Sequence, residues 1–216
     1  MDRMVTDILL QVFGIGVTVF MFLYSHGIPQ KIYAKLRQRA LAADAESKRQ
    51  FVRGAQLLSQ ARRSSTSTTR STLAKQAEEQ ADKAIAYDPR DAAAHILKGL
   101  ALDLQGFKTS ALASFDIALS PLAIKSLTEV ERGDALYRRA ELLMSIKSRE
   151  GRVESAIQDL TRAVEICEDK AKAFRLLGEC YEAEEKKEEA RNAYEEALKV
   201  EPEYPAARAA LDRLGE

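Results

Sequence analysis

A pattern of small and bulky residues between positions 174 and 202 constrains the fold more than any other feature of this sequence. Gly178 and Ala190 are small, so two antiparallel helices that carry them can approach closely. Tyr194 supplies a bulky ring for the space around that contact, and Pro202 ends the second helix because proline cannot continue one. Residues 171–204 are therefore predicted to form one helical hairpin.

The same pattern recurs twice upstream of this hairpin. In residues 92–125 the small and bulky positions are Gly99, Ala111, Phe115 and Ala118. In residues 133–170 they are Ala140, Ala156, Leu160 and Ala163, so alanine stands where the other hairpins have glycine. The spacing from Ala140 to Ala156 is longer than in the other hairpins, and we assign the additional residues to a turn at 148–151. Repeated hairpins of this kind predict a stacked array with a continuous core.

A fourth, degenerate hairpin is predicted at residues 45–91. Its second helix carries Ala77, Ala81 and Ala84 before Pro89, and its first helix would run from 45 to 63 with Phe51, Leu57 and Leu58 on its apolar face. Between them lies an insertion at 64–72 that is almost entirely Ser and Thr. Such a polar, low-complexity segment is predicted to be a flexible loop.

Two basic residues, Arg62 and Arg63, precede Ser64 and Ser65 in this insertion. The arrangement fits a substrate of a basophilic kinase, whose phosphates would add charge to an exposed segment. A solvated loop explains the same residues without modification, so the sequence leaves the modification of Ser64 and Ser65 open.

The C-terminal motif resembles the signature of the tetratricopeptide repeat (TPR) family, with Phe174, Leu177, Gly178, Tyr181, Ala190, Tyr194, Ala197 and Pro202 at the signature positions. The resemblance covers residues 45–216, completely in the last repeat and partially in the others. It implies an all-α, TPR-type superhelix of about three to four helical hairpins, closed by a capping helix at 205–216. It also implies a concave face, lined by the first helix of each hairpin, that receives a peptide or helix of a partner protein.

The N-terminal segment 1–30 contains a long apolar stretch and predicts a transmembrane signal-anchor, with residues 5–28 crossing the membrane. The stretch from Ile8 to Tyr24 contains no charge, and its extension to Ile28 reaches the length that a helix needs to cross a bilayer. A cleaved signal peptide is an alternative, because Ser25 and Gly27 are small residues at a spacing typical of cleavage sites. A buried core helix is the third possibility.

Basic residues follow the apolar stretch in segment 31–44, namely Lys31, Lys35, Arg37 and Arg39. The positive-inside rule then places the rest of the chain in the cytosol. The predicted localisation is an integral, single-pass protein of the endoplasmic reticulum or an outer organelle membrane, with its repeats facing the cytosol. The basic segment would also suit contact with anionic headgroups.

Composition argues against several other classes of protein. Lys and Arg number 33 and Asp and Glu number 33, so the chain lacks the basic excess of a general nucleic-acid binder. Cys167 and Cys180 are predicted to be free, buried thiols, and His95 is predicted to be a packing residue. The sequence contains no catalytic or phosphate-binding motif, so we expect no enzyme activity, no catalytic residues, no cofactor and no metal.

A partner-binding groove is predicted from the inner side of each first helix. The residues expected there, in chain order, are Ile96, Leu100, Asp103, Asp134, Tyr137, Glu141, Met144, Lys172, Arg175, Glu179 and Glu182. Tyr137 and Arg175 are of the residue types that most often anchor interfaces. Simple solvent exposure is the alternative for each residue.

One known TPR ligand is not expected for this groove. TPR co-chaperones hold the acidic tails of heat-shock chaperones with a carboxylate clamp of Lys, Asn and Arg residues. At the matching positions this chain has Ile96, Leu100, Tyr137 and Glu141, and only Lys172 and Arg175 are basic. The clamp is therefore predicted to be absent.

The leading functional hypothesis is a membrane-anchored TPR adaptor or scaffold that binds a partner protein without catalysis. The alternative is a structural or assembly subunit of a larger membrane complex, because Gln11 in the apolar stretch would seek a partner helix. A secreted or luminal TPR protein, produced by signal cleavage, is the third hypothesis. The sequence predicts neither the partner nor the oligomeric state.

Overall fold

The computed structural model describes residues 2–25, 28–146 and 151–215, and within these ranges all regular secondary structure is helical. This confirms the predicted all-α class. The elements in chain order are α1 Asp2–Ser25, α2 Ile28–Arg63, α3 Ser67–Tyr87, α4 Ala92–Gln105, α5 Lys108–Ala118, the 3-10 helix η1 Ile124–Ser126, α6 Glu129–Ser145, α7 Arg152–Ile166, α8 Ala171–Ala183, α9 Lys187–Val200 and α10 Pro205–Gly215.

The chain divides into two compact units, Met1–Glu46 and Ser47–Glu216. The first unit holds α1 and the N-terminal part of α2. The second unit holds the rest of α2 and every later helix, and it contains the repeated motifs. The two units are therefore described separately.

The structure contradicts the predicted membrane anchor. Among the described residues, no helix is long and apolar enough to cross a membrane. This finding overturns the integral, single-pass localisation predicted for residues 5–28. Gly27, which entered the prediction of a cleavage site, lies outside the described residues.

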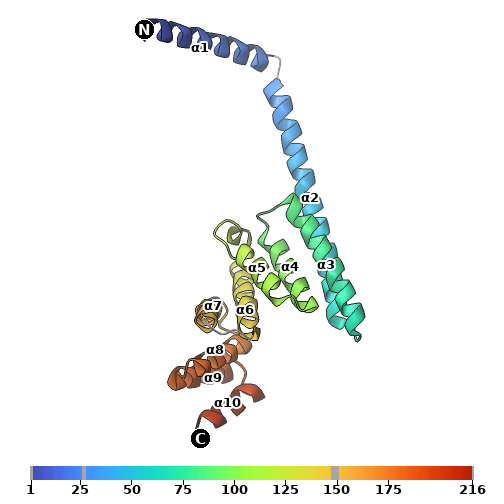
Figure 1. Ribbon diagram of the computed structural model, residues 1–216, viewed down its shortest axis with the longest axis vertical. Coiled ribbons are helices and arrows are strands. Elements are labelled where there is room, and N and C mark those ends of the chain that lie inside the picture. Colours follow the sequence, from blue (N-terminus) through green and yellow to red (C-terminus); the bar gives the residue numbers. More distant parts are fainter. Residues whose placement is uncertain (1, 26–27, 147–150, 216) are drawn as a thin grey trace. The chain divides into compact units, whose positions relative to one another are not determined.

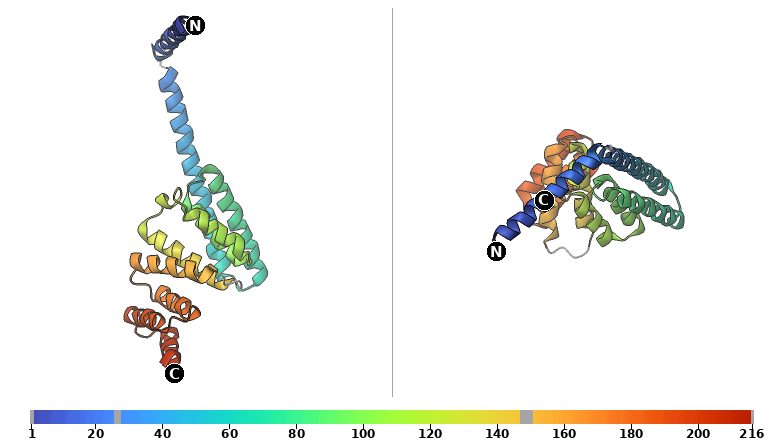
Figure 2. Two further views of the ribbon diagram at one scale, coloured as in Figure 1. Left: turned by 60° about the vertical axis from the view of Figure 1, so that its left-hand side comes forward. Right: turned by 90° about the horizontal axis from the view of Figure 1, so that it is seen from above.

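The second unit is a stack of helical hairpins (Figures 1 and 2). From α3 to α10, each α-helix packs against the next one in the chain. The hairpins are α2–α3, α4–α5, α6–α7 and α8–α9, and α10 covers the end of the last one. This order confirms the TPR-type arrangement expected from the sequence motifs.

Close approach within the hairpins depends on glycine. A Cβ atom on Gly178 would lie 2.5 Å from Cε1 of Tyr194, and one on Gly99 would lie 2.8 Å from the ring of Phe115. Both rings are fully buried. Only a residue without a side chain leaves room for an aromatic ring at this distance, so each glycine determines how closely its two helices pack.

In the other two described hairpins, α6–α7 and α2–α3, smaller residues lie at the contact between packed helices. In α6–α7, Ala140 and Leu160 are fully buried at the corresponding positions. In α2–α3, a Cβ atom on Gly54 would lie 2.8 Å from Leu97 of the next hairpin and 3.2 Å from the carbonyl oxygen of Ala77. Gly54 therefore allows the first hairpin to pack tightly against the second.

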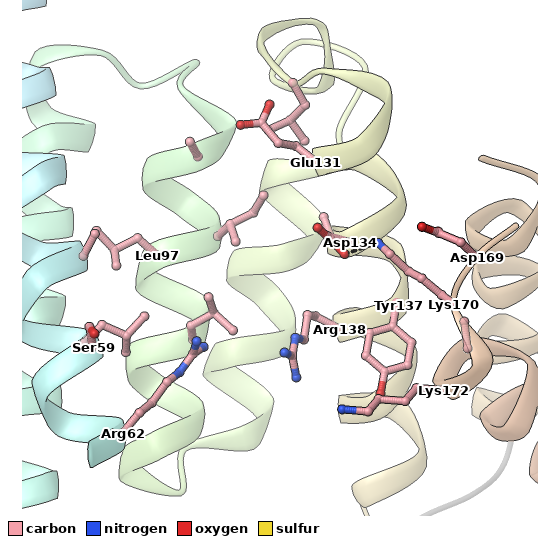
Figure 3. Close-up of a pocket in the computed structure, with 18 of the residues that line it drawn as sticks. Ser59, Arg62, Leu97, Glu131, Asp134, Tyr137, Arg138, Asp169, Lys170 and Lys172 are labelled. Carbon is pink, nitrogen blue, oxygen red and sulfur yellow. Dashed lines mark hydrogen bonds and ion pairs between the residues drawn. The ribbon is translucent and has the colours of Figure 1, made fainter. Parts of the chain in front are cut away.

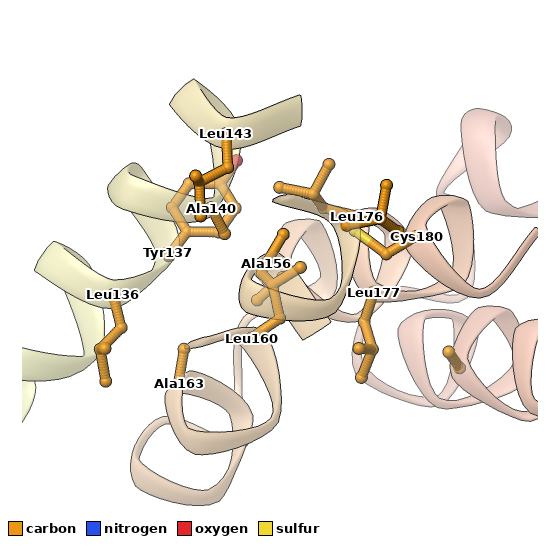
Figure 4. Close-up of a cluster of buried hydrophobic side chains, with 13 residues drawn as sticks. Leu136, Tyr137, Ala140, Leu143, Ala156, Leu160, Ala163, Leu176, Leu177 and Cys180 are labelled. Atoms are coloured by element: carbon orange, nitrogen blue, oxygen red, sulfur yellow. The ribbon is translucent and has the colours of Figure 1, made fainter. Parts of the chain in front are cut away.

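The largest core cluster of the described residues joins four consecutive helices, α6 to α9 (Figure 4). Leu136, Leu143 and Ala140 come from α6, and Leu160 from α7 lies between α6 and α8. Leu176, Leu177 and Cys180 come from α8, and Ala193 comes from α9. Each hairpin buries its apolar face against its neighbour, as expected for a repeat protein.

The Ser/Thr segment differs from its predicted form. Helix α3 begins at Ser67, so only residues 64–66 lie between α2 and α3. The hydroxyl of Thr72 donates to the carbonyl oxygen of Thr68 (3.0 Å), and the guanidinium of Arg70 donates to the carbonyl oxygen of Ser64 (3.2 Å). Residues 67–72 are therefore helical, with side chains that donate to nearby backbone carbonyls, which corrects the expectation of a loop at 64–72.

Other helix boundaries have clear local causes. Thr128 and Glu131 form a capping box at the start of α6, and the side chain of Asp91 accepts from the backbone N–H of Ala93 at the start of α4. Gly106 ends α4 with φ at 88°, a left-handed conformation that glycine adopts without strain. Most of the turn predicted at 148–151 lies outside the described residues, and α7 starts just after Gly151.

Helix α10 closes the C-terminal end of the array. Ala207 and Ala210 are buried against α9, and the guanidinium of Arg213 donates to both carboxylate oxygens of Glu182 at 2.8 and 2.9 Å. Glu182 also accepts from the hydroxyl of Tyr194 at 2.8 Å. The burial and the hydrogen bonds together fix α10 on the last repeat.

Candidate functional site

A groove of about 880 Å³ crosses the first helices of the four hairpins (Figure 3). It is lined by residues of α2, α4, α6 and α8, together with residues of the connections before α6 and α8 and at the end of α9. Its volume lies in the range of sites that bind ligands or peptide segments. The first helices therefore share one continuous groove within the second unit.

The floor of the groove is apolar and comes mainly from α2 and α4. Phe51 and Leu58 contribute from α2, Ile96 and Leu97 from α4, and Leu127 from the connection before α6. Leu58 and Leu97 are also core residues, so this part of the floor is rigid. Burial of such a surface by a ligand would be favourable by roughly 25 cal/mol for each Å² of apolar area.

Charged side chains occupy opposite sides of this floor. In the view of Figure 3, the carboxylates of Glu131, Asp134 and Asp169 lie in the upper half, and the cationic groups of Arg62, Arg138 and Lys172 lie in the lower half. We call the first set the acidic edge and the second set the basic edge. Each edge draws its residues from more than one hairpin.

The acidic edge is held by local hydrogen bonds. The Glu131 carboxylate accepts from the backbone N–H of Thr128 at 2.8 Å, and this bond lowers the pKa of Glu131. Asp134 pairs with the ammonium group of Lys170. Burial alone would lower the pKa of Lys170, but the hydrogen bond and charge of Asp134 outweigh it and raise that pKa. The hydrogen bond from Thr128 therefore keeps Glu131 ionised at neutral pH, and the pair with Asp134 keeps Lys170 charged.

The basic edge has fewer partners. Arg138 pairs with Glu141 at 2.8 Å and lies over the ring of Tyr137, with 5.5 Å between its guanidinium carbon and the ring centroid. Among the described residues, Arg62 and Lys172 have no acidic group within 4 Å. Partial burial and the like charge of Arg138 lower the pKa of Arg62. These two cations of the groove thus form no salt bridge among the described residues, although the more distant charge of Asp103 acts on Arg62.

A smaller cavity of about 550 Å³ adjoins the groove, since Leu100 and Arg138 line both. Its other lining residues include Asp103, Lys108 and Glu141. Burial raises the pKa of Asp103, and the nearby Lys108 opposes this rise. The cavity therefore extends the groove toward a mixed cluster of charges.

The structure brings most of the predicted groove residues together. Ile96, Leu100, Asp134, Tyr137 and Lys172 line the groove. Leu100, Asp103, Glu141 and Met144 line the adjoining cavity. Tyr137 is 9% exposed, and its hydroxyl donates to Glu141 at 2.6 Å, so most of the ring belongs to the core beneath the groove.

Three predicted residues lie elsewhere. Arg175 donates to the hydroxyl of Tyr204 at 2.9 Å and pairs with Glu179, and neither Arg175 nor Glu179 lines either cavity. Glu182 binds Arg213 of the capping helix. These side chains connect α8 to the C-terminal end of the array, where α10 covers the last hairpin.

Several residues of the groove were not predicted. Arg62 and Phe51 come from the first hairpin, for which no groove residues were proposed because its motif is degenerate. Asp169 and Lys170 lie in the connection before α8. Arg138 lies on the same helical face as Glu131 and Asp134, at spacings of seven and four residues, so helical periodicity would have identified it.

The described residues show little that suggests chemistry in the groove. No group of three or more His, Cys, Asp or Glu side chains among them is arranged to hold a metal ion. Cys167 and Cys180 are free and buried, as predicted, and burial raises the pKa of Cys180 to about 12. His95 is buried, with Nε2 3.0 Å from the carbonyl oxygen of Pro89, which agrees with its predicted packing role.

Comparison with known proteins supports the repeat assignment. The sequence profile of the tetratricopeptide repeat matches residues 171–204. No curated protein matches the sequence significantly. Among solved structures, a double mutant of MamA RS-1 shares 22% identity, with a TM-score of 0.62 over 79% of this chain and 83% of that one.

Two further structures have the same fold. MamA from Desulfovibrio magneticus RS-1 shares 21% identity, with a TM-score of 0.59 over 82% of this chain and 84% of that one. The PilF structure of Pseudomonas aeruginosa shares 19% identity, with a TM-score of 0.60 over 80% of this chain and 69% of that one. At these identities the likeness concerns the fold alone. The chain is therefore an all-helical protein of TPR-like fold that carries a tetratricopeptide repeat at residues 171–204.

Proposed function

We propose that this protein is an interaction scaffold that binds a segment of a partner protein in the groove of its first helices and catalyses no reaction. The observation that carries the proposal is the groove itself, whose volume of about 880 Å³ is lined by all four first helices. TPR-type folds typically mediate protein interactions, and the structure offers a concave surface of that kind.

The composition of the groove favours a peptide segment over a small polar ligand. Apolar side chains such as Phe51 and Ile96 form its floor, and charged groups line its edges. A segment with apolar anchors would bury the floor, and its polar groups would remain near the charged edges. Core packing fixes the floor, so little ordering of the scaffold would oppose binding.

Selection of peptides by the full chain tests this proposal. A displayed library of random 12-residue peptides is enriched on the immobilised protein, and the affinities of the enriched peptides are measured by fluorescence anisotropy. Ala93 lines the groove on α4, whereas Ala113 lies exposed on α5 and does not line it. Ala93→Gln places a larger neutral side chain in the groove, and Ala113→Gln is the matched control.

We expect Ala93→Gln to weaken binding by about tenfold or more, which corresponds to ~1.4 kcal/mol, and Ala113→Gln to leave binding unchanged. Failure to enrich any peptide would contradict the proposal. Equal affinities for the two variants would contradict it as well, since the peptides would then bind outside the groove.

A further inference from the structure

The two charged edges of the groove indicate what kind of segment it accepts. Figure 3 shows the cationic groups of Arg62, Arg138 and Lys172 along one side of the apolar floor, opposite the acidic edge. These three residues come from α2, α6 and α8, so the basic edge runs across the array rather than along one helix. A ligand that follows the groove would meet all three.

The charged groups of the two edges have different partners. On the acidic edge, Asp134 pairs with Lys170, the Glu131 carboxylate accepts hydrogen bonds from Thr128, and Asp169 forms no salt bridge among the described residues. On the basic edge, only Arg138 forms a salt bridge among the described residues, and its side chain is 47% exposed. Arg62 and Lys172 form none, and the charge of Asp103 acts on Arg62 from beyond salt-bridge distance.

Arg62 is the most informative of these residues. It lies in the last turn of α2, where it lines the groove, and it experiences the like charge of Arg138. A carboxylate placed near the two guanidinium groups would relieve this repulsion and accept charge-assisted hydrogen bonds from both. The geometry therefore favours an anionic group at this point of the groove.

We infer that the groove selects a partner segment in which apolar side chains are flanked on one side by Asp or Glu, and that Arg62, Arg138 and Lys172 recognise these carboxylates. This inference rests on the proposed function and specifies the class of partner. The apolar residues of the segment cover Phe51 and Ile96, and its acidic residues face the basic edge. Charge complementarity then fixes the orientation of the segment across the hairpins.

The same peptide selection tests this inference through the composition of the enriched peptides. We expect them to combine apolar residues with Asp or Glu, and to bind more weakly as the salt concentration rises. Arg62→Glu should weaken their binding by about tenfold or more. Arg63→Glu is the matched control, because Arg63 is the exposed neighbour at the end of α2 and does not line the groove. It should change the affinity by less than about twofold, as is typical of a charge outside the contact.

The outcomes separate this inference from the proposed function. Peptides that are sensitive to Ala93→Gln but lack acidic residues, or that respond equally to Arg62→Glu and Arg63→Glu, would overturn the charge selectivity and leave the groove as the binding site. The absence of any enriched peptide would overturn both. Circular dichroism of each variant establishes that it is folded, and Arg138→Glu provides a second test at an exposed side chain on another helix.

Discussion

Gly178 and Tyr194 show how single residues set the geometry of a hairpin. A Cβ atom on Gly178 would lie 2.5 to 2.8 Å from three atoms of the Tyr194 ring, closer than real Cβ contacts. In hairpin α6–α7 the corresponding residues are Ala140 and Leu160, both fully buried. Glycine thus accompanies a ring and alanine accompanies leucine, because the space between the helices must be filled without overlap.

The variant Gly178→Ala tests this pairing. We expect it to lower the free energy of unfolding by about 1–3 kcal/mol, since an additional methyl group would force the Tyr194 ring to move. Tyr194→Leu in the same chain reproduces the pair found in α6–α7 and should recover part of the loss. Tyr194→Phe keeps the ring and should recover none of it.

Urea denaturation of the single and double variants measures this coupling. A favourable coupling energy of about 1 kcal/mol between Gly178→Ala and Tyr194→Leu is expected, because the two positions are in contact. Strictly additive effects would show that the ring does not determine the requirement for glycine.

Cys180 predicts a dependence of stability on pH. Burial, together with the charge of Glu179, raises its pKa to about 12, whereas a free thiol has a pKa of about 8.5. Between these values the unfolded chain loses the thiol proton and the folded chain keeps it. The unfolded state then binds fewer protons, so stability is unaffected below pH ~8.5 and falls as the pH rises toward 12.

Chemical denaturation under reducing conditions at pH 8 and pH 10 checks this expectation against Cys180→Ala. Between those two pH values, the wild-type chain should lose up to ~1 kcal/mol more per pH unit than the variant, a value reduced for partial solvent screening. An equal loss in both proteins would mean that another group causes the alkaline destabilisation.

Among the elements of the second unit, the later hairpins were predictable from the sequence. The helical form of residues 67–72 in the first hairpin, α2–α3, was not. Glycine, alanine and aromatic positions recur in α4–α5 and α8–α9, so their pairing was predictable. The segment from Ser67 to Thr72 has poor helix propensity, yet it is helical in α3. Packing of α3 against α4 overrides that propensity, and composition does not show this packing.

Helix α10 is predicted to be essential to the end of the array. Deletion of residues 205–216 would expose Tyr194 and Ala197, which it covers, and would remove the bond from Arg213 to Glu182. We expect the truncated chain to unfold at a lower temperature, by about 4–8 °C for a loss of ~2 kcal/mol, and to self-associate.

Differential scanning calorimetry and size-exclusion chromatography of the truncated chain test this role. Arg213→Ala is the control, because it removes an exposed ion pair and keeps the apolar contacts. It should shift the unfolding temperature by no more than about 2 °C. A truncated chain as stable and monomeric as the control would show that α10 does not cap the array.

At the scale of the whole molecule, the position of the groove was predictable and its charge pattern was not. Ile96, Leu100 and Tyr137 were expected on the inner faces of the first helices, and they line the groove or its floor. The basic edge joins residues from hairpins distant in sequence, such as Arg62 and Lys172, and only the superhelical stacking brings them to one side. Arg175 was misplaced because its partner, Tyr204, belongs to the connection before the capping helix.

We propose that the first helices of the hairpins form the binding surface of this protein. A selected peptide that carries a benzophenone group can be crosslinked to the full chain, and mass spectrometry identifies the crosslinked residues. We expect crosslinks on α2, α4, α6 and α8, at groove residues such as Phe51 and Ile96. Crosslinks confined to the second helices, α5, α7 and α9, would contradict it.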